Sequence, residues 1–245
     1  MKKLLVLIPS LILTTAAHAE WTGMYAGANV GYDWNSSTMK TYVSTPGHYF
    51  TGADVAAIDG VGSDTPTSAN VMGGVQVGYH FQQDRLIVGF DLDINSFETD
   101  TNYKVASAYP GSSSSYTIEQ SMKTSFLSTL RPHVGYAHKN FLGYVTGGLA
   151  VTDMHSDAKF YDDTGSNAYE DESQPSLKAG WTIGAGIEYK VATTWSIGAQ
   201  YLYTAFGNIS TTGQLMEGET PVAELKHDAD LTSSILRLVV NCHFG

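Results

Sequence analysis

The feature that most constrains this chain is a strict two-residue alternation of apolar and other side chains from Lys178 to Val191. One face of this stretch is apolar throughout, whereas the other holds only glycine, threonine, lysine and glutamate. Because successive side chains of a β-strand point to opposite faces, a period of two sustained over this length predicts a strand. Strands of soluble sheets are usually about 5–6 residues long, so this strand is unusually long.

The same alternation recurs along the chain and predicts eight strands in all. Each strand has one apolar face and one face of glycine, small polar residues and isolated charges. The pattern is weakest over 122–137, 141–154 and 195–207. The predicted strands are 24–34, 71–81, 86–95, 122–137, 141–154, 178–191, 195–207 and 236–244.

The connections between these strands alternate between short and long. Tight turns are predicted at 82–85, 137–140 and 192–194, and long stretches rich in Ser, Thr, Gly and Asp occupy 36–69, 98–120, 156–177 and 208–230. Outer-membrane barrels have this asymmetry, with short periplasmic turns and long extracellular loops. The sequence therefore predicts an all-β fold, an eight-stranded antiparallel transmembrane up-and-down β-barrel with four long extracellular loops.

The first residues predict export from the cytoplasm. Lys2 and Lys3 precede an apolar run from Leu4 to Leu13, and Ala17-His18-Ala19 offers the small-x-small pattern of a cleavage site. We expect residues 1–19 to be a signal peptide and residues 20–245 to form the outer-membrane barrel.

Charge and cysteine content limit which partners and which covalent cross-links the exported chain can have. Two of its 13 Lys and Arg would leave with the signal peptide, so 11 would face 24 Asp and Glu, a net charge of −13. Such a surface repels phosphate backbones, so we expect no nucleic-acid partner. The single cysteine, Cys242, excludes an internal disulfide and lies at a position predicted to face lipid.

The residues of the non-apolar face indicate which face lies inside the barrel. A soluble, lipocalin-like barrel would turn its apolar face inward and its charges outward. Glycine with sparse charges suits the crowded lumen of a closed eight-stranded barrel, and the apolar face then contacts lipid. Aromatic residues near the strand ends would lie at the membrane interfaces. These aromatics are Trp34, Tyr79, Phe81, Tyr136, Trp181, Tyr189, Trp195 and Phe244.

Charged residues at inward positions predict a network inside the barrel. Asp91 and Arg131 fall at similar depths on neighbouring strands, so we expect them to pair. Two interpretations are open: paired charges that merely make burial tolerable, which we favour, or a gate for ions. The predicted members are Asp91, Asp93, Arg131, Glu188, Lys190 and Arg237.

The predicted loops carry few residues with recognisable chemistry. Acidic residues gather between Asp153 and Glu172 and could bind Ca²⁺, although their spacing does not match an EF-hand. His48, His155 and His227 are possible haem or metal ligands in the loops, with no pair at metal-ligand spacing. We expect no resident cofactor, with hemin as the one alternative.

An enzyme is the third class of function that the loops could support. His155, Ser156 and Asp157 are adjacent in sequence, but neighbours on a strand point to opposite faces and cannot form one triad. The chain has no G-x-S-x-G motif. We therefore expect no enzymatic activity, and an outer-membrane lipid-modifying enzyme is the weakest alternative.

The glycine and aromatic spacing resembles the porin-like family of small outer-membrane β-barrels, with an OmpA-like transmembrane barrel, which includes surface antigens and hemin-binding proteins. Residues 21–32 resemble the family's opening strand, and 131–136 with 144–150 resemble its fourth and fifth strands. Residues 180–189 and 201–207 resemble the sixth and seventh. The resemblance runs through the whole mature chain in order.

The resemblance implies a non-enzymatic protein of the cell outer membrane in a Gram-negative bacterium, with a structural or antigenic role. It implies contact with outer-membrane lipid and lipopolysaccharide, and loops that interact with host surface molecules or the environment. The family's last strand ends on an aromatic residue that the barrel-assembly machinery reads, and here Phe244 lies one residue before the end. Hemin binding or a small-solute channel is the alternative.

Overall fold

The protein folds into one long closed barrel. The computed structural model describes residues 21–163 and 169–244, with side chains left out over 169–175. The predicted signal peptide, 1–19, lies outside the described residues. The elements are β1 (Gly23–Thr45), α1 (Gly52–Val61), β2 (Ser63–Asp64), β3 (Thr67–Gln83), β4 (Leu86–Ala108), β5 (Ser115–His138), β6 (Phe141–Asp162), β7 (Tyr169–Lys190), β8 (Trp195–Glu217) and β9 (Thr220–Phe244).

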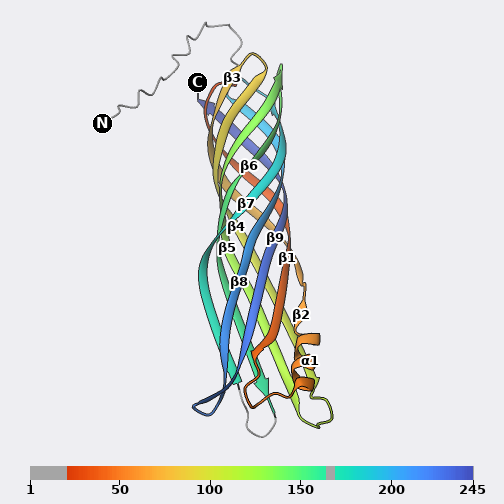
Figure 1. Cartoon of the computed structure of the whole chain (residues 1–245). Coiled ribbons are helices and arrows are strands. Elements are labelled where there is room, and N and C mark those ends of the chain that lie inside the picture. The colour runs from red at the N-terminus through yellow and green to blue at the C-terminus, as the bar shows by residue number, and fades with distance from the viewer. Residues whose placement is uncertain (1–20, 164–168, 245) are drawn as a thin grey trace, which may run out of the picture.

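The eight long strands form a single antiparallel ring. Each pairs with its neighbour in sequence, and β9 pairs with β1 from Phe244 against Met24 to Glu224 against Thr45, which closes the barrel (Figure 1). The predicted eight-stranded antiparallel up-and-down barrel is therefore confirmed. Among the described residues, no helix has the length and apolar character needed to cross a membrane.

The tight turns are where the sequence predicts them. They join β3 to β4, β5 to β6 and β7 to β8, at the same end of the barrel as the carboxyl terminus (Figure 1). Asp84 and Lys139 each have a φ of 54°, a left-handed conformation that these two turns require.

The prediction of four long loops is wrong for most of their length. β1 continues to Thr45, β4 to Ala108, β6 to Asp162 and β8 to Glu217. The next strand begins soon after β4, β6 and β8, whereas the connection after β1 holds α1 and β2. The connection between β8 and β9 is only Gly218 and Glu219. The barrel wall thus continues through residues that the composition had assigned to loops.

The physical reason is a reversal of the apolar face along β1, β4, β5, β6, β8 and β9, which β9 illustrates. Near the turns, Leu236 and Leu238 face outward while Arg237 is buried inside. Towards the other end, Leu225 and Leu231 are buried inside, and the outward residues are polar. We call these two parts the turn half and the distal half of the barrel.

The lumen of the distal half is an apolar core in two layers. The lower layer lies next to the turn half and includes Met39, Phe97, Met122, Leu127, Met154, Leu231 and Ile235. The upper layer lies at the distal tip, the end that carries α1 and that Figure 1 draws at the bottom. It includes Val43, Phe50, Ile58, Tyr109, Tyr116, Phe160 and Leu225. Such a core stabilises the distal strands as it would those of a water-soluble barrel.

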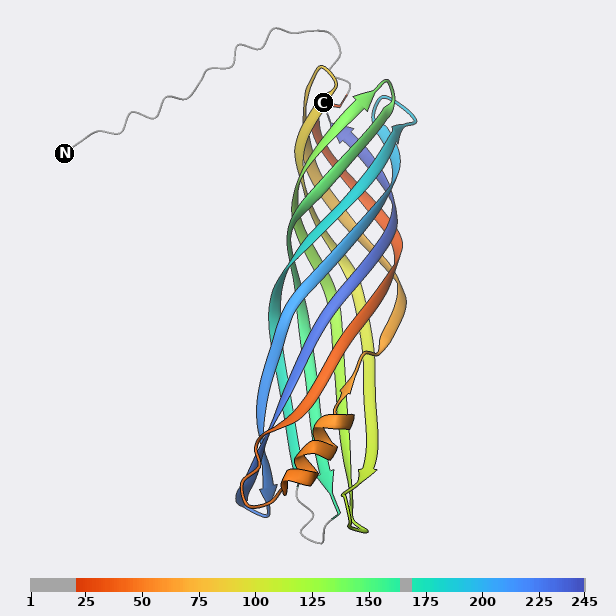
Figure 2. The ribbon, with the colours of Figure 1, turned by 45° about the vertical axis from the view of Figure 1, so that its right-hand side comes forward.

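The first distal connection completes the wall with a helix. β3 pairs with β4 only up to Gly74 against Asn95, but it pairs with β1 as far as Thr67. Beyond that, β2 and α1 lie between β1 and β4 (Figure 2). α1 begins with a capping box between Thr51 and Asp54. The Asp59 carboxylate accepts from the backbone N–H of Val43 at 3.0 Å, which ties α1 to β1.

Candidate functional site inside the barrel

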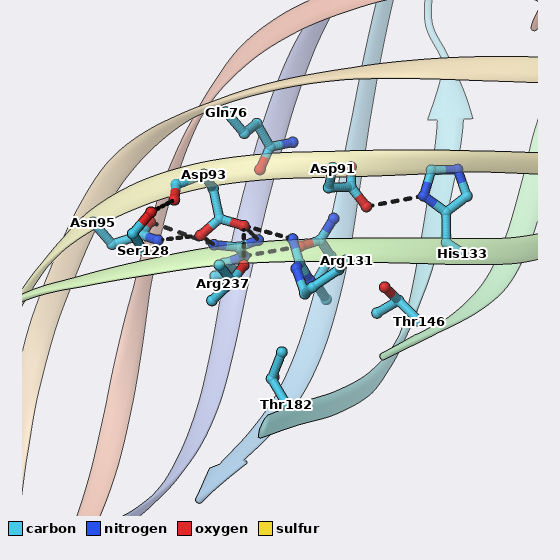
Figure 3. A network of polar contacts seen from close by, with 12 residues as sticks. Gln76, Asp91, Asp93, Asn95, Ser128, Arg131, His133, Thr146, Thr182 and Arg237 are labelled. Carbon is cyan, nitrogen blue, oxygen red and sulfur yellow. Dashed lines mark hydrogen bonds and ion pairs between the residues drawn. The ribbon is translucent and has the colours of Figure 1, made fainter. Parts of the chain in front are cut away.

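The lumen of the turn half holds a buried ion cluster centred on Asp93. Its Oδ2 atom lies 2.7 Å from Nη2 of Arg131 and 3.3 Å from Nη2 of Arg237. Figure 3 shows these contacts. All three side chains are fully buried. Thr129 donates its hydroxyl to the same oxygen at 2.7 Å. One carboxylate thus links two guanidinium groups from β5 and β9, which is what buried charges need to be tolerated.

Asp91 does not form the predicted ion pair with Arg131. The two residues are direct cross-strand neighbours, as the sequence indicated, but the Arg131 guanidinium reaches Asp93, one inward position further along β4. Asp91 instead lies 2.9 Å from Nδ1 of His133 and accepts a hydrogen bond from the Tyr25 hydroxyl. The length of the arginine side chain explains the difference, since it can bridge two inward positions.

Glu188 and Lys190 lie inside the barrel, but outside the ion cluster. Glu188 accepts hydrogen bonds from Ser196 at 2.9 Å and from Asn241 at 3.1 Å. Lys190 stands over the ring of Trp21 at 5.0 Å. Both are close to the turns, nearer the mouth than the arginines, and the structure places no arginine against Glu188. The predicted network of six charges is therefore smaller, with Asp93, Arg131 and Arg237 at its centre.

Neutral side chains extend this cluster. Nε of Arg237 donates to Gln200 at 2.8 Å, and Gln200 donates to the Tyr144 hydroxyl. Asn95 accepts from Nη1 of Arg237 at 3.3 Å. The sequence analysis left these residues out, although each occupies an inward position of the alternation.

Three histidines that the sequence analysis did not single out gather at the mouth near the turns. His80, His133 and His243 come from β3, β5 and β9, and each is buried. The ring centroids of His80 and His133 are 4.9 Å apart, and those of His80 and His243 are 6.0 Å apart. A signal was present, because all three are inward positions close to a turn.

Glycine on the strand between two of these histidines makes room for them. Gly89 pairs with His80 on one side and with His133 on the other. A Cβ at Gly89 would lie 2.5 Å from Nε2 of His133 and 2.1 Å from the carbonyl oxygen of Tyr79. A side chain there would therefore displace the histidine ring.

At the distal tip, Asp162 anchors two tyrosines of the upper apolar layer. Its Oδ2 atom accepts from the Tyr109 hydroxyl at 2.5 Å and from the Tyr49 hydroxyl at 3.1 Å. Burial, followed by the Asp162 carboxylate, raises the pKa of Tyr109 above its ordinary value. The tip is therefore closed by a hydrogen-bonded aromatic cluster.

The three histidines proposed as haem or metal ligands do not come together. His48 is exposed in the connection after β1, and His155 is exposed on the outside of β6. His227 is buried inside β9, with Nδ1 2.8 Å from the Thr41 hydroxyl and 3.3 Å from the Gln120 amide. The placement of His155 and His227 in loops was wrong, because both belong to distal strands. Within the described residues, no group of three metal-ligating side chains is close enough to hold a metal ion.

Comparison with known proteins identifies the family. The model described as the outer membrane protein beta-barrel domain matches residues 4–244. The chain belongs to that family. The protein is accordingly a β-barrel of the cell outer membrane, and the turn half, with its outward apolar face, is the part that spans the membrane.

Two relatives carry names that describe surface proteins. The 31 kDa outer-membrane immunogenic protein of Brucella melitensis biotype 1 is 31% identical over 191 residues, 76% of this chain and 72% of that protein. The 25 kDa outer-membrane immunogenic protein of Brucella abortus biovar 1 is 28% identical over 193 residues, 79% of this chain and 69% of that protein.

A solved structure of the same fold is the outer membrane protein OprG from Pseudomonas aeruginosa. It has a TM-score of 0.53 at 13% identity and covers 91% of this chain and 97% of its own. At this identity the likeness concerns the fold alone.

The lipid-facing surface follows the predicted alternation. Trp181, Ile183 and Ile187 are 52%, 56% and 62% exposed on the outside, whereas Glu188 is only 2% exposed. The soluble-barrel alternative, with these residues in the centre, is thereby excluded for the turn half. The aromatics expected at the membrane interfaces also point outward, with Phe81 half-buried and the others exposed: Trp34, Tyr79, Tyr136, Trp181, Tyr189, Trp195 and Phe244.

Proposed function

We propose that the protein is a non-enzymatic surface barrel that holds an antigenic distal half outside the cell. The observation that carries this proposal is the reversal of the apolar face, which gives the turn half a lipid-facing surface and the distal half a water-facing one. The printed names of the two Brucella relatives, both outer-membrane immunogenic proteins, support a surface role.

A structural role for the lumen fits better than a channel. The ion cluster, the three histidines and two apolar layers occupy successive levels of the interior. An apolar layer across a lumen opposes ions, because an ion there would lose its hydration. The buried charges then serve to hold the strands together rather than to gate a pore.

Hemin binding and catalysis receive no support from the geometry. The three candidate haem ligands lie on the inside, the outside and a connection of the barrel. His155, Ser156 and Asp157 follow one another on β6, so their side chains alternate in direction. We therefore assign neither activity.

The partners follow from the two halves. The turn half would contact outer-membrane lipid and lipopolysaccharide, and the distal half would meet host surface molecules or other components of the environment. The barrel-assembly machinery would recognise Phe244, the last residue of β9, whose side chain faces outward. Residues 1–19 would direct export as a signal peptide.

Electrophoresis of the purified protein with and without boiling tests the membrane barrel. We expect faster migration without boiling, because the folded barrel stays compact in detergent. Protease treatment of intact cells tests the display of the distal half and should cleave only at distal connections, such as 46–51. Equal mobility in both samples, or cleavage at 82–85, would overturn the proposal.

Conductance in planar bilayers separates the surface role from the channel alternative. We expect no stable single-channel steps from the pure protein. Steps of a few hundred picosiemens would mean that the lumen opens, since a narrow filled barrel offers no continuous water path.

A further inference from the structure

Trp21 closes the mouth of the barrel near the turns. It precedes β1, yet it is only 1% exposed, and its backbone N–H donates to the Gln82 side chain at 3.0 Å. Its ring meets those of His80 and His243 edge-on, with centroids 6.0 and 5.6 Å apart. The other three tryptophans of the chain, Trp34, Trp181 and Trp195, face outward.

Each of the three histidines against this plug has one ring nitrogen without a hydrogen-bond partner among the described residues. These atoms are Nδ1 of His80, Nε2 of His133 and Nδ1 of His243. The other nitrogen of His133 contacts Asp91, and that of His243 lies 2.9 Å from the Ser196 hydroxyl. The partnerless nitrogens are buried sites at which a proton can add to an imidazole.

The surroundings accommodate one charged imidazole better than three. Only His133 contacts a carboxylate directly, whereas His243 reaches Glu188 through Ser196. Lys190 already places a positive charge over Trp21. The titratable and charged groups that face the cluster are Tyr25 of β1, Asp91 of β4, Arg131 of β5, Tyr144 of β6, and Glu188 and Lys190 of β7, while β8 contributes the neutral Ser196.

We propose that Trp21 and the three histidines form a proton-responsive plug at the periplasmic mouth of the lumen. When His80 and His243 take up protons, they repel each other and Lys190, and Trp21 leaves its buried place. Water then enters the lumen from the periplasmic side as far as the lower apolar layer. This inference goes beyond the proposed surface role, because that layer keeps the barrel closed to ions in either state.

A variant with a single tryptophan tests the plug directly. Replacing Trp34, Trp181 and Trp195 with phenylalanine leaves Trp21 as the only tryptophan of the mature protein. Its emission and its quenching by acrylamide are followed in vesicles as the pH falls from about 7.5 to about 3, because buried imidazoles take up protons at lower pH than exposed ones. We expect a red shift and a severalfold rise in quenching. Constant emission and quenching over this range would contradict the proposal.

Histidine variants identify the groups that take up the protons. In the single-tryptophan background, H80Q with H243Q should abolish the acid transition, whereas H138Q, at the exposed last residue of β5, should leave it unchanged. A transition that persists in H80Q with H243Q would assign the protons to Asp91 or Glu188 and overturn the plug. Faster migration without boiling confirms that each variant is folded.

A measurement without histidine substitutions covers the case in which the double variant fails to fold. NMR of protein labelled at the histidine ring carbons follows protonation of each imidazole in the native sequence. At least two buried imidazoles should titrate together with the Trp21 signal, and imidazoles that stay neutral while Trp21 moves would refute the mechanism. The plug can fail in these tests while the gel and protease results still support the surface role.

Discussion

At the scale of single residues, Asp93 has the most consequential position in the chain. It is the only carboxylate within 4 Å of both Arg131 and Arg237 in the described structure, and none of the three side chains reaches solvent. A buried ion cluster adds little net stability over an apolar core, but removing one partner is costly because the other charges remain buried. Asp93 therefore determines whether two arginines can occupy the membrane-spanning lumen.

Replacing Asp93 with asparagine should lower the free energy of unfolding by about 3–5 kcal/mol, because two guanidinium groups lose their carboxylate. D100N is the matched control on the same strand. Asp100 pairs with Lys123 at 3.8 Å, and both are largely exposed, so its loss should cost less than about 1 kcal/mol. Urea unfolding in detergent micelles measures both. Equal effects of the two variants would contradict the role assigned to Asp93.

At the scale of elements, the strands β1, β4, β5, β6, β8 and β9 each join two chemically different halves, and several pairing registers shift near the junction. Pairing registers shift between Ser96 and Thr99 on β4, between Lys123 and Leu127 on β5, and between Phe206 and Ile209 on β8. A bulge inserts an extra residue and so changes which residues face inward. On β5 and β8 the inward positions change between even and odd numbers at this level, which moves one apolar series from lipid to lumen. On β4 the inward positions stay odd-numbered, and the apolar residues themselves change from even to odd positions.

These shifts explain which part of the fold the sequence could predict. In the turn half, apolar residues alternate without interruption with glycine, small polar residues and isolated charges, as in Trp181 to Tyr189, and the strands and turns were predicted correctly. In the distal half, the apolar alternation of β4 and β9 restarts in the opposite sense, and a bulge interrupts that of β5 and β8. The outward residues there are more polar, so these segments resembled loops. The residues of the ion cluster were predicted from their charges, but which of them pair depends on the length of their side chains. The histidines were missed because a neutral imidazole does not indicate in the sequence which residue it will contact.

The helix α1 offers a test at the same scale. Ile58 is fully buried in the upper apolar layer, whereas Ala56 is exposed on the same helix. I58D should release α1 and raise proteolysis within 46–66 by roughly 10-fold or more, because burying an unpaired carboxylate costs at least about 2 kcal/mol. A56D adds the same charge in water and should change little. Timed digestion of intact cells followed by mass spectrometry measures the cleavage rate, and similar rates for both variants would contradict the packing of α1.

At the scale of the whole molecule, the strands are about twice as long as a membrane requires. β9 has 25 residues, while a transmembrane strand needs about 9–11. The surplus of roughly 15 residues, at about 3.3 Å each and a tilt of about 40°, raises the distal tip about 38 Å above the bilayer. The protein therefore presents a rigid column rather than flexible loops.

Cysteine labelling on intact cells locates the membrane boundary along this column. In a C242A background, K226C should react with a membrane-impermeant maleimide, because Lys226 lies outward in the distal half. L238C should not react until the membrane is dissolved, since Leu238 lies in the outward apolar band. Labelling of both positions in intact cells would place the boundary elsewhere.

The helical patch in the wall has a practical consequence for engineering. β2 continues the register of β3 against β1, from Ser36 opposite Thr67 to Met39 opposite Asp64, and α1 follows outside that ladder. A foreign peptide grafted at Gly52, the exposed first residue of α1, would therefore interrupt no strand pairing and would lie away from the buried Ile58, unlike one placed within the paired part of β1 or β9. This makes the segment the natural attachment point for epitopes in a cell-surface display scaffold.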